Sequence, residues 1–245
     1  MTGFLAEIRE TFLWNRDSPF GPLPPLLVSM TLVTGLVDAF SYLVLGHVFV
    51  ANMTGNVVLL GFALVGAPGF SIDASLVSIA SFVVGGLVGG QLGSRFGHHR
   101  GRHLGSGATV QVVFLATGMA LAALSGKPIA SGYHYGLIVV LAVGMGIQNA
   151  TARKLAVPDL TTTVLTLTIT GIAADSAIGG GTGSKAGRRL VAVGTMLAGA
   201  VVGASFVVHH QIVLPLVIAV IVTLGVAATA HVLGSSSPAW TRTKS

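Results

Sequence analysis

The sequence predicts an all-α integral membrane protein with six transmembrane helices plus two short broken or re-entrant helices, arranged as an inverted internal repeat. Composition is the first reason, because 8% of the 245 residues are charged and 52% are hydrophobic, with a mean hydropathy of +0.86. Soluble domains carry about a quarter charged residues. The second reason is a series of long apolar stretches, and the third is a pair of similar polar interruptions.

The long apolar stretches have the length of membrane spans, since about 20 helical residues cross roughly 30 Å of hydrocarbon. Glycine is abundant, with 34 residues, as is common in transmembrane helices whose backbones approach closely. The predicted spans are residues 26–46, 74–94, 105–125, 134–152, 190–208 and 212–232.

Two further apolar segments are shorter and begin at polar interruptions. Residues 47–57 read HVFVANMTGNV and lead into the segment 52–66, whereas residues 155–164 read LAVPDLTTTV and lead into the segment 160–175. About 15 helical residues reach roughly 23 Å, which is too short to cross a bilayer comfortably. Each segment is therefore expected either to enter the membrane and return, or to cross with the help of the extended chain before it.

The basic residues favour the first of these topologies. If both short segments return to the face they left, all 13 Lys and Arg residues except Lys127 fall on one side of the membrane. Basic residues gather on the cytoplasmic side of membrane proteins. We therefore expect six crossings, two re-entrant elements and cytoplasmic termini. If both segments crossed, five basic residues would move to the opposite side: Arg95, Arg100, Arg102, Arg153 and Lys154.

Each half of the chain would then contain three crossings and one re-entrant element, so the halves would have opposite orientation. The re-entrant elements would enter from opposite faces and meet near the midplane, an arrangement that marks binding sites in transporters. The predicted parts are a cytoplasmic amphipathic segment (1–25), a first repeat (26–125), an extracytoplasmic linker (126–133), a second repeat (134–232) and a cytoplasmic tail (233–245).

Glycine-rich faces occur in the third helix of each predicted half. Small residues let two helices pack closely, so we expect these faces to contact a neighbouring helix, and they would also allow a homo-oligomer. The residues concerned are Gly85, Gly86, Gly89, Gly90, Gly93, Gly194, Gly199 and Gly203.

The polar interruptions contain the candidate solute site. Irregular backbone at membrane depth is tolerated only where it is buried in protein or lines a water-filled cavity. Asn52 and Thr54 suit the N-cap position of the first short helix, and Asp159 and Thr161 suit that of the second. The first N–H groups of each helix carry partial positive charge. These residues either face one another around a solute or merely cap buried helix ends. The predicted substrate-binding residues are Asp38, Asn52, Thr54, Asn56, Asn149, Asp159, Thr161 and Thr163.

Asp38 lies inside the first predicted span, and Asn149 occupies the corresponding place in the second half. An ionisable group there costs at least a few kcal/mol unless it is paired or hydrated. Asp38 is therefore expected to bind a solute or proton, to bond the broken-helix backbone, or to pair with Arg153. Arg153 is most simply a topology anchor, although it could also reach an anionic solute. Asp175 is expected to form an ion pair near the membrane surface.

Several runs of residues carry a family resemblance. They are GLVDA at 35–39, VFVANMTGN at 48–56, GIQNA at 146–150 and TTVLT at 162–166, with Val157-Pro158 between the last two. Together they resemble the YoaK-like family of bacterial membrane proteins, a group of unknown function that often carries two basic residues where Arg153 and Lys154 stand here. The resemblance covers nearly the whole chain after residue 25. It implies a multi-pass protein of the bacterial inner membrane and brings no activity with it.

The sequence favours a membrane transporter or channel for a small polar solute or ion. The alternative is a non-transporting assembly or regulatory protein that acts through its glycine-rich helix faces. The chain has no cysteine and lacks both a Ser/His/Asp order and a His-Glu-x-x-His motif, so we expect no enzymatic activity, cofactor or metal. The expected partners are the lipid bilayer and the solute. Nucleic acid is not expected, because the net charge of +6 is first a topology signal in a membrane protein.

Overall fold

The computed structural model describes residues 2–13, 18–126, 129–163, 165–181, 185–235 and 239–242. Lys127, which is expected on the opposite side of the membrane from the other basic residues, lies outside these ranges. Within them the chain is helical and forms no β-strand. The helices are α1 (Thr2–Phe12), α2 (Leu23–Val44), α3 (Met53–Leu64), α4 (Ile72–Phe96), α5 (Arg100–Leu124), α6 (Ser131–Leu155), α7 (Leu165–Ala174), α8 (Ala186–Val208), α9 (Leu214–Gly234) and the 3-10 helix η1 (Ala239–Thr241).

Six helices in the described ranges are long and apolar enough to span a membrane, namely α2, α4, α5, α6, α8 and α9. This finding confirms the prediction of an all-helical, multi-pass membrane protein. The observed helices begin earlier than several predicted spans. For example, α2 begins at Leu23 because prolines occupy its first turn, where a missing N–H donor costs nothing.

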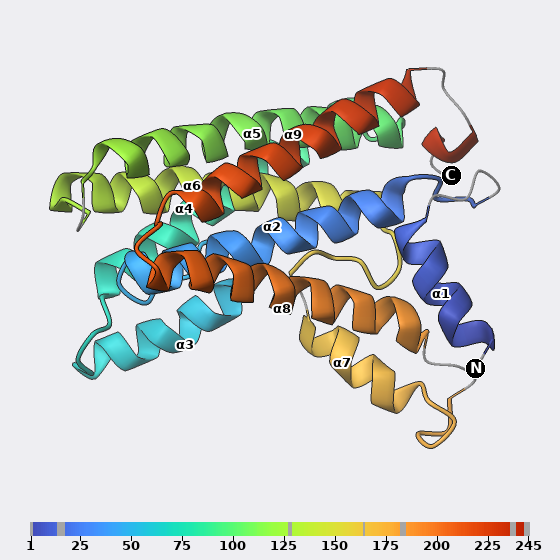
Figure 1. Ribbon diagram of the computed structural model, residues 1–245, viewed down its shortest axis with the longest axis horizontal. Helices are drawn as coiled ribbons and strands as arrows, with labels where there is room; N and C mark the ends of the chain where they lie inside the picture. The colour runs from blue at the N-terminus through green and yellow to red at the C-terminus, as the bar shows by residue number, and fades with distance from the viewer. Residues whose placement is uncertain are drawn as a thin grey trace.

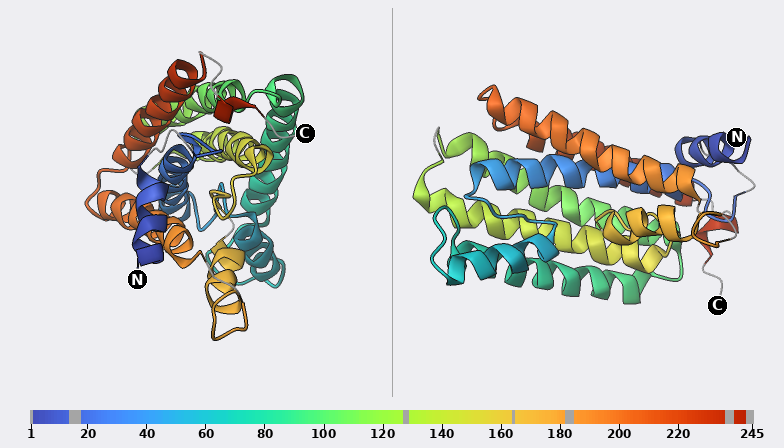
Figure 2. Two further views of the ribbon diagram at one scale, coloured as in Figure 1. Left: turned by 90° about the vertical axis from the view of Figure 1, so that its right-hand side faces the viewer. Right: turned by 90° about the horizontal axis from the view of Figure 1, so that it is seen from below.

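The two halves of the chain are packed into each other. In the end-on view, α2 and α6 occupy the centre of the bundle and the other long helices surround them (Figure 2). α2 packs most extensively on α8, α6 packs most extensively on α4, and α5 packs on α9 (Figure 1). Each central helix thus has its main partner in the other half of the chain.

Glycines make these close crossings of helices feasible. Gly35 of α2 faces Gly199 of α8, and Gly146 of α6 faces Gly85 of α4. A Cβ atom at any of these four positions would collide with backbone atoms of the facing helix. The predicted glycine-rich faces therefore contact neighbouring helices of the same chain at Gly85 and Gly199.

Polar side chains also join the central helices. Gln148 of α6 donates its amide to the Thr34 hydroxyl of α2 at 2.9 Å and accepts a 2.6 Å bond from the Gln111 amide of α5. All three side chains are fully buried. Because buried polar groups are costly without partners, these bonds fix the relative register of α2, α5 and α6.

The short helices α3 and α7 lie along one side of the bundle, one toward each end (Figures 1 and 2). α3 packs on α4, and α7 packs on α8. α3 runs from near the middle of the bundle to the end at which α2 finishes, and α7 runs from near the middle to the opposite end (Figure 1). Their 12 and 10 residues are too few to cross a membrane as helices.

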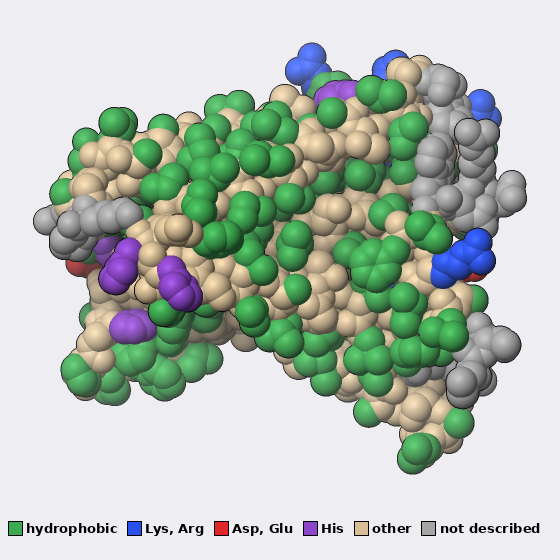
Figure 3. Space-filling view, viewed as in Figure 1, with side chains coloured by type: hydrophobic (Ala, Val, Ile, Leu, Met, Phe, Trp, Pro, Cys, Tyr) green, Lys and Arg blue, Asp and Glu red, His purple; other side chains and the backbone are tan. Residues whose placement is uncertain are grey.

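The described Lys and Arg residues all belong to α1, to η1 and its neighbours, or to the ends of helices that meet near α1 (Figure 1). On the face shown in Figure 3, their side chains lie in the half of the molecule that carries α1. α1 itself packs on α8, where the Glu7 carboxylate accepts the backbone N–H of Gly187 at 2.9 Å. The two long-axis ends of the molecule therefore differ strongly in charge.

Candidate solute-binding site

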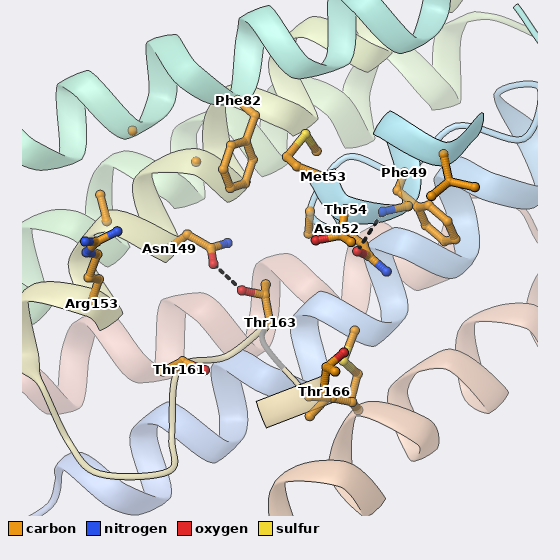
Figure 4. A pocket seen from close by; sticks show the side chains of 18 of the residues that line it. Phe49, Asn52, Met53, Thr54, Phe82, Asn149, Arg153, Thr161, Thr163 and Thr166 are labelled. Atoms are coloured by element: carbon orange, nitrogen blue, oxygen red, sulfur yellow. Dashed lines mark hydrogen bonds between the residues drawn. The ribbon is translucent and has the colours of Figure 1, made fainter. Parts of the chain in front are cut away.

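A cavity of about 1060 Å³ lies between the starts of α3 and α7. The outline of the molecule is indented beside it, between the lobe that carries α3 and the lobe that carries α7 (Figure 3). Figure 4 shows the cavity from close by. Its lining residues come from six helices and from the segments 49–52 and 161–163: Tyr42, Phe49, Ala51, Asn52, Met53, Thr54, Gly55, Val58, Leu59, Phe82, Gly86, Gly146, Asn149, Ala150, Arg153, Thr161, Thr163, Leu165, Thr166 and Met196.

Asn52 begins the first short helix at the cavity wall. Its side-chain Oδ1 accepts the backbone N–H of Gly55 at 3.2 Å, so the predicted N-cap is confirmed. Thr54 lies in the first turn of α3 and also lines the cavity. The first N–H groups of a helix have no partners within it and carry partial positive charge. This wall of the cavity is therefore electropositive without containing a cation.

Asp38 lies behind this wall and does not line the cavity. Its buried carboxylate Oδ1 accepts the backbone N–H groups of Val50 at 3.1 Å and Ala51 at 2.9 Å. Among the described residues it forms no ion pair with Arg153. Asp38 thus supplies the hydrogen-bond acceptor for the irregular backbone that leads into α3. This is one of the roles expected from the sequence. Non-helical N–H groups at membrane depth need such partners.

Asn56 performs a similar task one turn into α3. Its fully buried side chain accepts the Phe49 N–H at 2.9 Å and donates to the Phe49 carbonyl at 2.6 Å. Ser78 of α4 donates to the same carbonyl at 2.6 Å. Asn56 therefore does not face the cavity but holds Phe49, whose ring stacks on Tyr42 with centroids 4.8 Å apart. Both rings line the cavity.

The second interrupted segment is held from α6. Thr163 donates its hydroxyl to the Oδ1 atom of Asn149 (Figure 4), and the Asn149 amide donates to the Met145 carbonyl at 3.0 Å. The segment between them turns through left-handed backbone at Asp159 and Thr162, each with φ of 65°. Asn149 therefore fastens the second segment to α6 much as Asp38 fastens the first to α2.

The prediction of Asp159 as an N-cap was wrong, because α7 begins six residues later, at Leu165. Asp159 does not line the cavity and belongs to a cluster of charges. The Arg189 side chain of α8 donates to Asp159 at 2.8 Å and to Asp175 at 2.7 Å. Asp175 thus forms the ion pair expected from the sequence. Gly171 of α7 leaves room for the guanidinium, since a Cβ atom there would stand 2.5 Å from it. Arg189 therefore holds the chain on both sides of α7.

Comparison with known proteins places the chain in a family. The profile of the family described as "Protein of unknown function (DUF1275)" matches residues 26–229. The chain belongs to this family. A curated relative, the UPF0700 transmembrane protein YoaK of Bacillus subtilis (strain 168), is 33% identical over 150 residues, which cover 61% of this chain and 65% of the relative. The match thus spans a little under two thirds of that relative, and no solved structure matches the chain.

The family match confirms the resemblance inferred from the sequence. The structure brings five of the eight predicted site residues to the cavity: Asn52, Thr54, Asn149, Thr161 and Thr163. The other three, Asp38, Asn56 and Asp159, hold backbone or side chains around it. No group of three His, Asp or Glu side chains in the described ranges is placed to hold a metal ion.

Sequence reasoning missed several lining residues and underrated one. Phe82 and Gly86 of α4 and Met196 of α8 line the cavity, yet they lie in uninterrupted apolar helices that carry no local signal. Arg153, interpreted mainly as a topology anchor, lines the cavity as well. Its position directly before the second interruption was the signal that pointed to this role.

Proposed function

We propose that the protein is a membrane transporter or channel for a small polar solute or ion, and that it is not an enzyme. The observation that carries this proposal is the cavity, in which polar side chains from two separate interrupted segments gather inside an apolar helical bundle. A concave, largely apolar pocket with a few convergent polar groups is the usual form of a small-molecule site. The five lining residues predicted from the sequence would contact the solute.

In this proposal α3 and α7 are re-entrant. Helices of 12 and 10 residues extend roughly 18 Å and 15 Å, well short of a bilayer core of about 30 Å. Their courses support the idea, because each begins near the middle of the bundle and ends toward a different end (Figure 1). The cavity between their starts would then lie near the midplane.

The helix packing supports an inverted repeat. Exchanging α2 with α6, α3 with α7, α4 with α8 and α5 with α9 turns the α2–α8 packing into the α6–α4 packing and leaves the α5–α9 packing in place. The glycine crossings follow the same exchange, since the Gly35–Gly199 contact becomes the Gly146–Gly85 contact. Opposed repeats around a central site suit alternating access by movement of one repeat against the other.

The charge distribution supports an orientation with the α1 end in the cytoplasm, because basic residues gather on the cytoplasmic side. Both termini would then be cytoplasmic, and the membrane would be the bacterial inner membrane. The alternative of an assembly protein would have to act through Gly86, Gly90 and Gly194, where an added Cβ atom meets nothing within 4 Å. Gly85 and Gly199 are covered by α6 and α2 of the same chain.

Filling the cavity tests the proposal directly. Gly86 lines the cavity, and a Cβ atom there would meet no atom within 4 Å. We expect Gly86→Phe to fold normally and to abolish solute flux into reconstituted vesicles. Flux is measured by stopped-flow light scattering with a neutral, a cationic and two anionic solutes: xylitol, choline, chloride and benzenesulfonate.

Gly90→Phe is the matched control. Gly90 lies one turn further along α4, is exposed, has the same free space and does not line the cavity. We expect this variant to retain wild-type flux. The transport proposal fails if none of the four solutes moves faster than through protein-free vesicles, or if Gly86→Phe conducts as well as Gly90→Phe.

A further inference from the structure

The charges around the cavity indicate which class of solute it would take. The carboxylates of Asp38 and Asp159 are bonded to backbone N–H groups and to Arg189 respectively. Neither lines the cavity. Arg153 is the charged side chain among the residues that do. The charged part of the cavity lining is therefore basic.

Arg153 has no protein counter-ion in the part of the chain that the structure describes. A guanidinium cannot lose its charge in a protein, and the Arg153 side chain is exposed in the last turn of α6. Guanidinium groups bind carboxylates through two parallel hydrogen bonds. An anionic group in the cavity would supply the partner that the described chain does not.

Neutral groups around the cavity can add to such binding. The first turn of α3 contributes the partial positive charge of a helix start. Thr54, Thr161 and Thr166 contribute hydroxyls that can donate hydrogen bonds to an anion. These donors lie on different elements, so they surround the cavity rather than form one polar strip (Figure 4).

The remainder of the wall is apolar and aromatic. Phe49, Phe82 and Met53 line it together with Met196, and Figure 4 shows Phe49 at the end of the cavity opposite Arg153. A volume of about 1060 Å³ is far larger than a halide requires and is at the upper end of drug-sized pockets. The geometry suits a molecule with a charged group at one end and an apolar body at the other.

We propose that the cavity binds an organic anion, a carboxylate with an apolar body, with the carboxylate at Arg153 and the body against Phe49, Met53 and Phe82. The proposal rests on the proposed function in that it names the solute class of the same site. Because the cavity lies beside an indentation between α3 and α7 (Figure 3), the carboxylate can come from water or, as a fatty acid, from the bilayer.

Binding of radiolabelled benzoate to the purified full-length protein in detergent tests this assignment. Benzylammonium and benzyl alcohol share the ring and differ in charge, so they serve as competitors. We expect unlabelled benzoate to displace the label at concentrations at which the cation and the alcohol do not. Arg153→Gln should weaken benzoate binding roughly tenfold or more, as expected for a lost charge-assisted pair.

Lys154→Gln is the matched control, because it removes the same charge from the adjacent residue. Lys154 lies against Gly93 and Gly97 of α4 and does not line the cavity. We expect its benzoate affinity to stay within about twofold of wild type. Equal elution and melting behaviour of the two variants shows that both are folded.

Palmitate as a competitor distinguishes the two sources of the carboxylate. Strong displacement of benzoate by palmitate assigns a carboxylate from the bilayer, and weak displacement assigns one from water.

The assignment is wrong if benzoate does not bind, if benzylammonium or benzyl alcohol displaces it equally well, or if Arg153→Gln binds it like the wild type. Failure of this inference can be told from failure of the transport proposal. If choline or xylitol flux is blocked by Gly86→Phe but benzoate does not bind, the transport proposal holds and the anion site does not. Arg153-dependent benzoate binding without any flux would leave an anion site without transport.

Discussion

Asp38 of α2 and Asn149 of α6 each hold an irregular segment next to the cavity, and they do so with different chemistry. The Asp38 carboxylate accepts two backbone N–H groups, whereas Asn149 accepts the Thr163 hydroxyl and donates to a carbonyl. A carboxylate that is ionised can only accept, and an amide can do both. The Oδ1 atom of Asp38 is therefore bonded to backbone, and Asp38 does not line the cavity.

This role predicts a graded response to substitution at Asp38. Asp38→Ala removes both acceptors and should lower the free energy of unfolding by roughly 2–4 kcal/mol, since buried N–H groups are left without partners. Asp38→Asn keeps one oxygen for the same two N–H groups and should cost clearly less. Denaturant or thermal unfolding in detergent measures both values. Equal damage by the two variants would show that the charge itself is needed.

The residue scale is also where sequence reasoning reached its limit. Asn52 was predictable as an N-cap because Asn before a glycine-containing helix start is a local pattern. Asn56 and Asp159 are polar in the same way, yet Asn56 bonds Phe49 and Ser78 of α4, and Asp159 bonds Arg189 of α8. Whether a polar residue faces a cavity or a neighbour depends on tertiary contacts that no local pattern contains.

At the scale of elements, α7 depends on its attachment to α8. It has 10 residues, and isolated helices shorter than about 12–15 residues are marginal. Arg189 bonds Asp159 before α7 and Asp175 after it, and its guanidinium lies against Gly171 within α7. One side chain of α8 thus contacts the segment before α7, the helix itself and the turn after it.

Arg189→Gln is therefore expected to loosen α7 without unfolding the bundle. Amide hydrogen exchange across 165–174 should become roughly fivefold or more faster, because local opening no longer breaks two ion pairs. Exchange in α2 and α6 should stay unchanged. Arg188→Gln is the control, since Arg188 takes part in no ion pair among the described residues. Equal changes in amide exchange across 165–174 for the two substitutions would show that Arg189 does not hold α7.

The elements themselves were largely predictable. Hydropathy located all six long helices, because a bilayer demands long apolar stretches whatever they pack against. The start of α7 was placed too early, at 160 instead of Leu165. Left-handed backbone at Asp159 and Thr162 delays the helix, and such turns are set by the bonds to Arg189 and Asn149 rather than by local propensity.

At the scale of the whole molecule, the two loops that follow the short helices lie at opposite ends. Pro68 follows α3 and Ile178 follows α7, and both are exposed. The natural chain has no cysteine, so Pro68→Cys and Ile178→Cys each introduce a single reactive thiol. We expect a membrane-impermeant maleimide to label Ile178→Cys from the cytoplasmic side and Pro68→Cys from the opposite side. Labelling of both from one side would mean that the short helices cross the membrane.

The cavity as a whole was beyond sequence reasoning. Its polar residues come from the two interruptions, which were visible, but its apolar wall includes Phe82, Gly86 and Met196 from helices of both halves. Their approach follows from the glycine crossings at Gly35 and Gly146, whose partners are more than one helix away in the chain. Size and charge of the cavity therefore required the assembled bundle.

The exchange of partners between the halves also affects how the protein is made. α2 ends at Val44, whereas α8, the helix that covers its glycine face, begins at Ala186. Because the chain is made from its N-terminus, α2 leaves the ribosome long before α8. The face of α2 around Gly35 therefore lacks its α8 partner until the second half of the chain has been made. The first half of the chain thus reaches its final packing only after α8 has been translated.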